Sequence, residues 1–203
     1  MSVKLYVEGG GAAKDLKIAC TRGFRLLMER AGFKRCMPSI VACGGRGASF
    51  DRFKTALGGG DDKYPMLLVD SESAVSKPPW EHLSGRDGWS RPAGAADDQA
   101  QLMVQCMETW CVADRDALLD FFGQCLRQNA LPALHGLEKR SKDDVQKMLS
   151  HATRDCGHGK NYQKGKRSFE LLAKLNPEVL KERLPHFKRL CVCLSERLSP
   201  SGE

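Results

Sequence analysis

Two short apolar segments, each ending in an acidic residue, constrain the fold more than any other feature of the sequence. The first runs from Val3 to Glu8 and continues into three glycines; the second runs from Met66 to Asp70, with Glu72 two positions later. Short apolar runs followed by turn residues predict β-strands. A helical period, another apolar run and a second short helix lie between them. The order is therefore β-α-β-α-β, which predicts a parallel sheet with right-handed crossovers.

The acids that follow these strands predict a metal site. Ligands of open α/β sheets bind at the carboxyl ends of the strands, where we expect Glu8, Asp70 and Glu72 to meet. Asp70 and Glu72 point to the same side if the strand continues beyond Asp70. Three carboxylates repel one another unless a cation lies among them, and oxygen ligands suit Mg²⁺ or Mn²⁺. The three glycines allow close approach of the backbone to a ligand, or they form only a tight turn before a helix.

The rest of the chain completes the predicted architecture. Residues 101–107 alternate well enough for a fourth strand, which gives a central, mostly parallel sheet of about four strands flanked by helices. We divide the chain into an α/β core, residues 1–125, and a helical C-terminal part, residues 126–203, packed on that core in the same domain. Residues 71–98 are rich in Pro, Gly, Ser and Asp and predict a long loop. We expect it to cover the substrate, or to be a surface insertion held by its two tryptophans.

Three helices can be placed from their spacing and their capping residues. Apolar residues recur with a helical period over residues 13–31. Asp114 or Asp116 is expected to cap a helix that ends at Phe122, and Ser141 to cap a later one. The outer face of the first helix is basic and carries Lys14, Lys17, Arg22, Arg25 and Arg30.

Charge and cysteine content limit the partners and the compartment. A formal net charge of +7 favours a polyanionic partner, nucleic acid first. Several of the nine cysteines, Cys125 among them, lie in apolar periodic segments, where reduced cysteines act as small hydrophobic side chains. We therefore expect a cytoplasmic protein. No apolar run is long enough to cross a bilayer, and the N-terminus does not resemble a signal peptide.

A basic stretch near residues 160–167 carries lysines around a tyrosine. Such side chains can hold a phosphate backbone and stack on a base, and Lys164 is the lysine that we expect near a scissile phosphate. A solvated basic loop is the alternative. The residues expected to contact nucleic acid are Arg46, Lys160, Tyr162, Lys164, Lys166 and Arg167.

The acid and glycine motifs resemble those of the Toprim domain, in which an acid followed by glycine comes after the first strand and D-x-D after a later one. The whole chain, over about residues 3–190, also resembles a Toprim-like family of single-domain prokaryotic proteins related to overcoming-lysogenization-defect-type nucleases. That resemblance is carried by VEGGG, LLVDSE, RPAGAADDQ, LMVQCMETW and KGKRSFELLA. Members of that family tend to be encoded beside ATPases in anti-phage or mobile-element loci.

The resemblance implies roles for individual acids. Glu8 would be a metal ligand or general base, and Asp70 and Glu72 the metal-binding pair, although Glu72 departs from strict D-x-D by its longer side chain. Glu108, in METW, would complete a second metal position; alternatively, it is a helix-start acid bound by backbone amides. The expected catalytic residues are Glu8, Asp70, Glu72, Glu108 and Lys164.

These features together predict a Mg²⁺-dependent nuclease. We expect it to be the effector of an anti-phage defence or toxin-type module that works with an ATPase partner, and a homodimer is compatible with the sequence. The alternative is a non-catalytic Toprim-like scaffold that binds nucleic acid or an ATPase. A strand-passing topoisomerase is disfavoured, because the chain has three tyrosines and no separate domain to present one of them.

Overall fold

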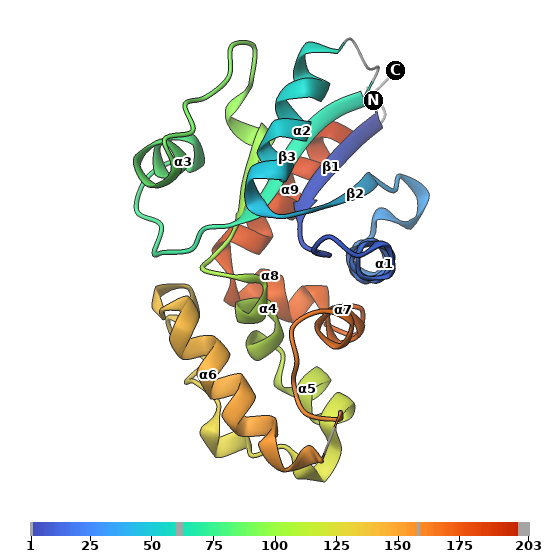
Figure 1. Ribbon diagram of the computed structural model, residues 1–203, viewed down its shortest axis with the longest axis vertical. Coiled ribbons are helices and arrows are strands. Elements are labelled where there is room, and N and C mark those ends of the chain that lie inside the picture. The colour runs from blue at the N-terminus through green and yellow to red at the C-terminus, as the bar shows by residue number, and fades with distance from the viewer. Residues whose placement is uncertain (1, 60–62, 158, 199–203) are drawn as a thin grey trace.

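A four-stranded, all-parallel sheet lies at the centre of the protein, in the order β2-β1-β3-β4 (Figure 1). The computed structural model describes residues 2–59, 63–157 and 159–198. The strands are β1 Ser2–Glu8, β2 Ser39–Gly44, β3 Lys63–Asp70 and β4 Ala100–Met103. The predicted α/β class, with a parallel sheet of about four strands flanked by helices, is therefore confirmed. Because β1 and β3 are adjacent and parallel, the acids at their ends lie at one edge of the sheet.

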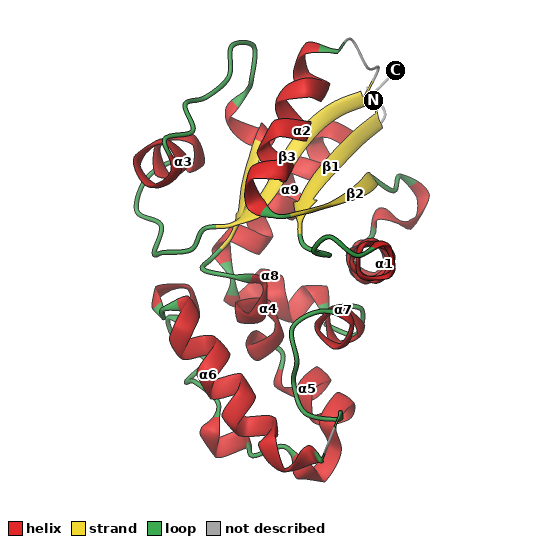
Figure 2. Ribbon diagram, viewed as in Figure 1, coloured by secondary structure: helices red, strands yellow, loops and turns green. Residues whose placement is uncertain are grey.

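Helices cover both faces of this sheet (Figure 2). Strand side chains alternate between the faces: Leu5 and Val7 belong to the hydrophobic cluster on one side, Tyr6 and Val69 to the cluster on the other. On the first face pack α1 Lys14–Arg30 and α9 Pro185–Leu198; on the second pack α2 Arg46–Gly58 and α3 Pro79–Asp87. A sheet buried on both faces explains why its strands read as nearly continuous apolar runs.

The remaining helices lie beyond the carboxyl edge of the sheet (Figure 1). They are α4 Met107–Ala113, α5 Arg115–Phe122, α6 Lys142–Thr153, α7 Lys166–Leu172 and α8 Pro177–Arg183. Trp110 of α4 joins them to the sheet layer, because its buried ring packs edge-on against Phe24 of α1 and Phe187 of α9, with centroids 6.1 and 4.8 Å apart. One hydrophobic cluster thus extends from β1 to α6.

The predicted caps are present. The Asp114 side chain accepts a hydrogen bond from the Ala117 N–H (3.1 Å), and Ser141 Oγ accepts one from the Asp144 N–H (3.1 Å). Each satisfies a backbone donor that the first turn of a helix leaves free. These two signals are local, and local signals are the ones that a sequence shows most clearly.

The predicted loop over residues 71–98 is wrong in one respect, because it contains α3. This helix is short and buries only Trp80 and Leu83, too few residues to show a period. Trp89 stacks on Phe50 of α2, with centroids 4.3 Å apart and an interplanar angle of 8°. The two tryptophans therefore hold the segment against the sheet layer, as the alternative expected.

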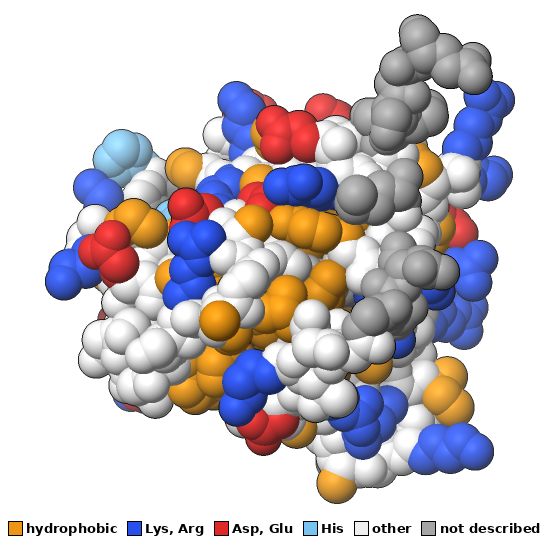
Figure 3. Space-filling view, turned by 90° about the horizontal axis from the view of Figure 1, so that it is seen from above, with side chains coloured by type: hydrophobic (Ala, Val, Ile, Leu, Met, Phe, Trp, Pro, Cys, Tyr) orange, Lys and Arg blue, Asp and Glu red, His pale blue; other side chains and the backbone are white. Residues whose placement is uncertain are grey.

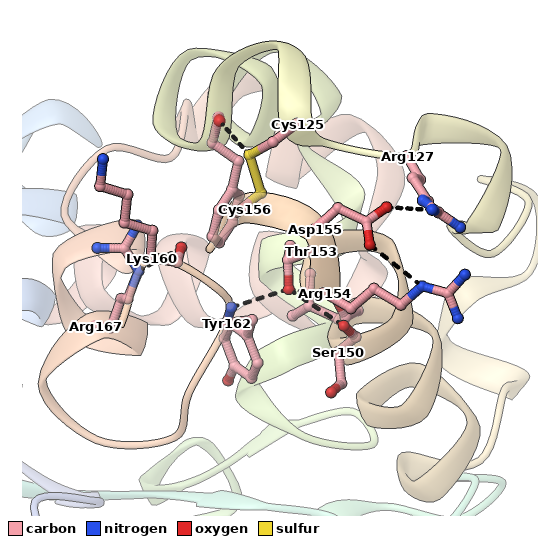
Figure 4. The surroundings of a disulfide bond; sticks show 12 residues. Cys125, Arg127, Ser150, Thr153, Arg154, Asp155, Cys156, Lys160, Tyr162 and Arg167 are labelled. Atoms are coloured by element: carbon pink, nitrogen blue, oxygen red, sulfur yellow. Dashed lines mark hydrogen bonds and ion pairs between the residues drawn. A yellow bond between two sulfur atoms is a disulfide. The ribbon is translucent and has the colours of Figure 1, made fainter. Parts of the chain in front are cut away.

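A disulfide corrects the expectation for Cys125. It joins Cys125, in a 3₁₀ turn after α5, to Cys156, in a 3₁₀ turn after α6 (Figure 4). The two residues are 31 positions apart in the sequence, and only the packing of these helix ends brings them together. The other seven cysteines are thiols, and only Cys36 among them is exposed.

Basic side chains outnumber acidic ones on the face drawn in Figure 3. Figure 3 shows Lys and Arg side chains spread over one face, with fewer acidic side chains between them. Among the described residues, no helix combines the length and the apolar character needed to cross a membrane.

Candidate metal centre

Three carboxylates meet at the carboxyl edge of the sheet, where β1 ends at Glu8 and β3 at Asp70. One oxygen each of Glu8, Asp70 and Glu72 lies within 4.8 Å of the others. Glu8 Oε2 also accepts a hydrogen bond from the Asp70 N–H (3.1 Å), which fixes the first acid against the end of the neighbouring strand. The structure thus brings together the three acids expected at this edge.

Glu72 reaches the cluster by a different route from the one expected. β3 ends at Asp70, and Glu72 has a φ of 64°, in the left-handed region. Its N–H donates to the Gln105 carbonyl (2.9 Å), and the Ser71 N–H donates to the Met103 carbonyl (2.9 Å). The turn, rather than strand alternation, therefore directs the Glu72 carboxylate back to Asp70. A non-glycine residue in this conformation is strained, and such residues concentrate at functional sites.

Two cations lie among the acids. Lys142 Nζ, from the first turn of α6, contacts Asp70 Oδ2 (3.1 Å) and Glu72 Oε1 (2.5 Å). Arg46 Nη1, from the first turn of α2, contacts Glu8 Oε2 (3.3 Å) and donates to the Asp70 carbonyl oxygen. These cations offset the repulsion among the three carboxylates.

Helix α3 supplies an outer layer of charge to the same cluster. Asp87 binds Arg46 through two hydrogen bonds of 3.0 and 2.6 Å. Arg86 Nη2 lies 3.8 Å from Glu72 Oε2, and His82 Nε2 lies 2.9 Å from the Ser71 carbonyl oxygen. The segment after the acids is therefore attached to the site itself.

Burial and mutual charge shift the pKa values of these groups. Burial raises the pKa of Asp70 from 3.8 to about 7; the charge of Glu8 adds to the rise, and Lys142 opposes it. Burial also raises the pKa of Glu8, against the lowering effect of Arg46. For Lys142, burial lowers the pKa, but the charges of Asp70 and Glu72 outweigh burial and raise it. The lysine is therefore a fixed positive charge, whereas Asp70 can exchange a proton near neutral pH.

A cavity of about 380 Å³ lies against two of the three acids, Glu8 and Asp70, and is also lined by Glu108, Lys142 and Lys164. The glycine loop forms another wall. Gly10 has a φ of 85°, and a Cβ there would lie 2.8 Å from the Lys17 Cα; at Gly44, with a φ of 88°, a Cβ would lie 2.5 Å from the Gly11 carbonyl oxygen. Only glycine fits such close backbone contacts. These contacts fit the tight turn before α1, and close approach of this backbone to a ligand stays a prediction.

Glu108 lies in the wall of this cavity but outside the group of three acids. It is buried in the first turn of α4. Its Oε1 accepts a hydrogen bond from the Tyr162 hydroxyl (2.8 Å), and its Oε2 accepts one from Gln146 Nε2 (3.3 Å). Side chains, rather than the backbone amides of the alternative, therefore satisfy this acid.

The structure contradicts the expectation that Tyr162 stacks on a base. The residue is only 6% exposed, and burial and the neighbouring Glu108 raise the pKa of its hydroxyl. The polar sequence around Tyr162 predicts an exposed loop, but the side chain packs inward. Its backbone N–H donates to Thr153 Oγ1 (2.9 Å, Figure 4). Arg46 is occupied by acids, as described above, so it is a partner of the cluster and not a free surface cation.

The other basic residues lie at the surface in different settings. Lys160, Lys164 and Lys166 are exposed, and Lys164 lines the cavity of the acids. The Arg167 guanidinium lies over the Phe121 ring, 4.7 Å from its centroid, and Arg167 Nε donates to the Lys160 carbonyl (3.0 Å). The predicted basic stretch is therefore not one continuous patch.

Sequence reasoning missed Lys142, Arg86, Asp87 and Gln146. A lysine at the first position of a helix opposes the helix dipole, and this unfavourable place is the signal that could have singled out Lys142. No comparable signal marks the other three, because each meets its partner through tertiary packing.

The donor set fits a metal ion. Three carboxylates supply oxygen ligands at one edge, the neighbouring cavity leaves room, and the ammonium of Lys142 already bridges two of the acids. The Lys142 ammonium lies between Asp70 and Glu72 because their negative charges attract a cation to this position.

The fold and the site define an α/β protein with an acidic, potentially metal-binding cluster at the carboxyl edge of a parallel sheet. The chain belongs to the family described as "Domain of unknown function (DUF4276)", whose model matches residues 7–195. All the site residues above fall inside that match. Comparisons with curated proteins and with solved structures give no match.

Proposed function

We propose that this protein is a metal-dependent phosphodiesterase that cuts nucleic acid. The observation that carries the proposal is the cluster of Glu8, Asp70 and Glu72, whose carboxylate oxygens converge beside a cavity that an exposed lysine also lines. Acids at the ends of adjacent parallel strands form a ligand set for Mg²⁺ or Mn²⁺. The net charge of +7 suits a phosphodiester substrate.

The residues of the site take distinct roles in this proposal. Glu8, Asp70 and Glu72 hold the metal, which when bound would stabilise negative charge on the phosphate and favour ionisation of water. Lys164, exposed at the cavity, donates to a non-bridging phosphate oxygen. Glu8, whose pKa is raised by burial, is both a ligand and the base that accepts a proton from the attacking water, while the P–O bond to the leaving oxygen breaks and that oxygen takes up a proton from solvent. Lys142 keeps the acids together, and Glu108 holds the cavity wall through Tyr162 and does not bind the ion.

The wider context of the proposal rests on the resemblance to Toprim-like nucleases. Under it the protein is the effector of a defence or toxin-type module, acting with an ATPase partner on DNA or RNA. The sequence motifs that carry the resemblance support this part of the proposal.

A non-catalytic scaffold is the second candidate, and one observation favours it. Lys142 Nζ bridges Asp70 and Glu72 at 3.1 and 2.5 Å, so the protein can satisfy these acids with its own cation. In that case the cluster stabilises the junction between β3 and α6, and the basic surface binds nucleic acid without cutting it.

A cleavage assay separates the two candidates. Plasmid, single-stranded DNA and bulk tRNA are incubated with the wild type, Asp70→Asn and Asp120→Asn in Mg²⁺, Mn²⁺ or EDTA. Asp120 is an exposed acid of α5 and provides the matched control. We expect cutting that needs metal, is lost in Asp70→Asn and persists in Asp120→Asn. Cutting by Asp70→Asn at the wild-type rate, or in EDTA, would refute the proposed site.

A further inference from the structure

A groove of about 650 Å³ runs between α1 and α7, next to the acidic cluster. Ile18, Leu26 and Ala173 contribute an apolar lining, and Ile18 is 60% exposed although it is a large apolar side chain, whereas Phe169 is buried. The helices touch closely at Gly23, where a Cβ would lie 2.7 Å from the Phe169 carbonyl oxygen. The groove therefore lies along a tight helix–helix contact.

Cations from both helices line this groove. Arg22 and Arg30 come from α1, Lys166 begins α7, and Lys174 lies two residues after the end of α7 at Leu172. Arg30 binds the Ala173 and Leu175 carbonyls at the end of α7. Across the described parts of the chain, the exposed side chains of Arg22, Lys166 and Lys174 form no ion pair or hydrogen bond. The acidic residues that line the groove are Asp15 and Glu170.

The groove adjoins the cavity of the acids. Phe169 lines both hollows, and Lys164 of the cavity precedes Lys166 of the groove by two positions. Leu16, at the start of α1, lines the cavity, and Ile18 lines the groove. The two hollows are therefore neighbours whose linings share Phe169.

We infer that this groove binds single-stranded nucleic acid and directs it to the acidic cluster. Grooves of this kind combine cations that follow the phosphate backbone with apolar surface that receives base faces. A duplex hides its base faces inside the stack, so it cannot use the apolar lining that the exposed Ile18 and the half-buried Leu26 provide. An acidic peptide would satisfy the cations but not this lining. The inference rests on the proposed function for the class of partner, and it adds the strandedness of the substrate and its path.

Charge reversal in the groove tests the inference. Arg22→Glu with Lys166→Glu is compared with Lys34→Glu plus Lys188→Glu, which changes the net charge equally at two exposed lysines outside the groove. Affinity for a labelled single-stranded oligonucleotide, its duplex and polyglutamate is measured by fluorescence anisotropy in EDTA over a range of salt. We expect the wild type to prefer the single strand. We expect the groove variant to lose about tenfold or more in affinity and the salt slope to fall by about 1.4, for two lost phosphate contacts.

Several results would overturn the inference: equal losses in the two double variants, a preference for duplex, or equally tight binding of polyglutamate. A milder pair, Arg22→Gln with Lys166→Gln, repeats the test if the reversal impairs folding, as judged by circular dichroism. EDTA removes the metal, so binding to the groove is measured without cleavage. The groove proposal and the nuclease proposal can therefore fail independently. Groove-dependent binding without any metal-dependent cutting refutes the nuclease and supports the groove, whereas cutting with groove-independent binding does the reverse.

Discussion

Asp70→Asn should change how the free energy of unfolding depends on pH. Burial in the folded protein disfavours the charged form of the Asp70 carboxyl, which water stabilises in the unfolded chain. Its pKa is raised from 3.8 to about 7, so the folded state holds the proton more tightly than the unfolded state does. The resulting stabilisation is complete below pH 3.8 and is lost as the pH rises through about 7. The asparagine variant carries no proton at this position and lacks this dependence.

The magnitude follows from the shift. Between pH 5 and 7 the wild type loses about 1.4 kcal/mol per pH unit relative to Asp70→Asn, or about 3 kcal/mol in all. The amide oxygen of asparagine can still accept the hydrogen bond that the Met107 N–H donates to Asp70 Oδ1 (3.0 Å). The variant loses the ion pair with Lys142, which lowers its stability at all pH values at which Asp70 is charged.

Urea unfolding in EDTA from pH 5 to 8.5 provides the measurement, with Asp120→Asn as the control. We expect the difference in free energy of unfolding, wild type minus Asp70→Asn, to fall by about 3 kcal/mol across this range. The same difference for Asp120→Asn should stay nearly constant. A difference that rises with pH would refute the reasoning, since it would mean that the ion pair with Lys142 outweighs the cost of burying the charge.

Three further predictions concern the surroundings of the site. Lys142→Met should lower the free energy of unfolding by about 2 kcal/mol, since it leaves the buried Asp70 and the half-buried Glu72 without their cation. It should also tighten Mg²⁺ binding in calorimetry; weaker binding would contradict this. Gly44→Ala should lower the free energy of unfolding by about 1–3 kcal/mol, because Gly44 has a φ of 88° and a Cβ there would meet the Gly11 carbonyl oxygen. An unchanged urea midpoint would argue against this close contact. Thiol titration in denaturant should find seven reactive thiols; nine would mean that Cys125 and Cys156 are not joined.

The sequence by itself determined the framework of the protein. Apolar runs ending at Glu8 and Asp70, separated by helical periods, were enough to predict parallel strands with acids at one edge of the sheet. The caps at Asp114 and Ser141 were equally visible. These features depend on neighbouring residues and on the preference of apolar side chains for the interior, and both can be judged from a short window of sequence.

Only the tertiary structure decided which groups surround those acids. Lys142 is 72 positions from Asp70, and Tyr162 is 54 positions from Glu108, so no local pattern links either pair. The left-handed turn at Glu72 depends on hydrogen bonds to the segment after β4. The sequence predicts where charged residues lie along the strands and helices. Which charges neutralise one another is set by the packing of α2, α3 and α6 around the sheet edge, because electrostatic pairing depends on distance in space and not in sequence.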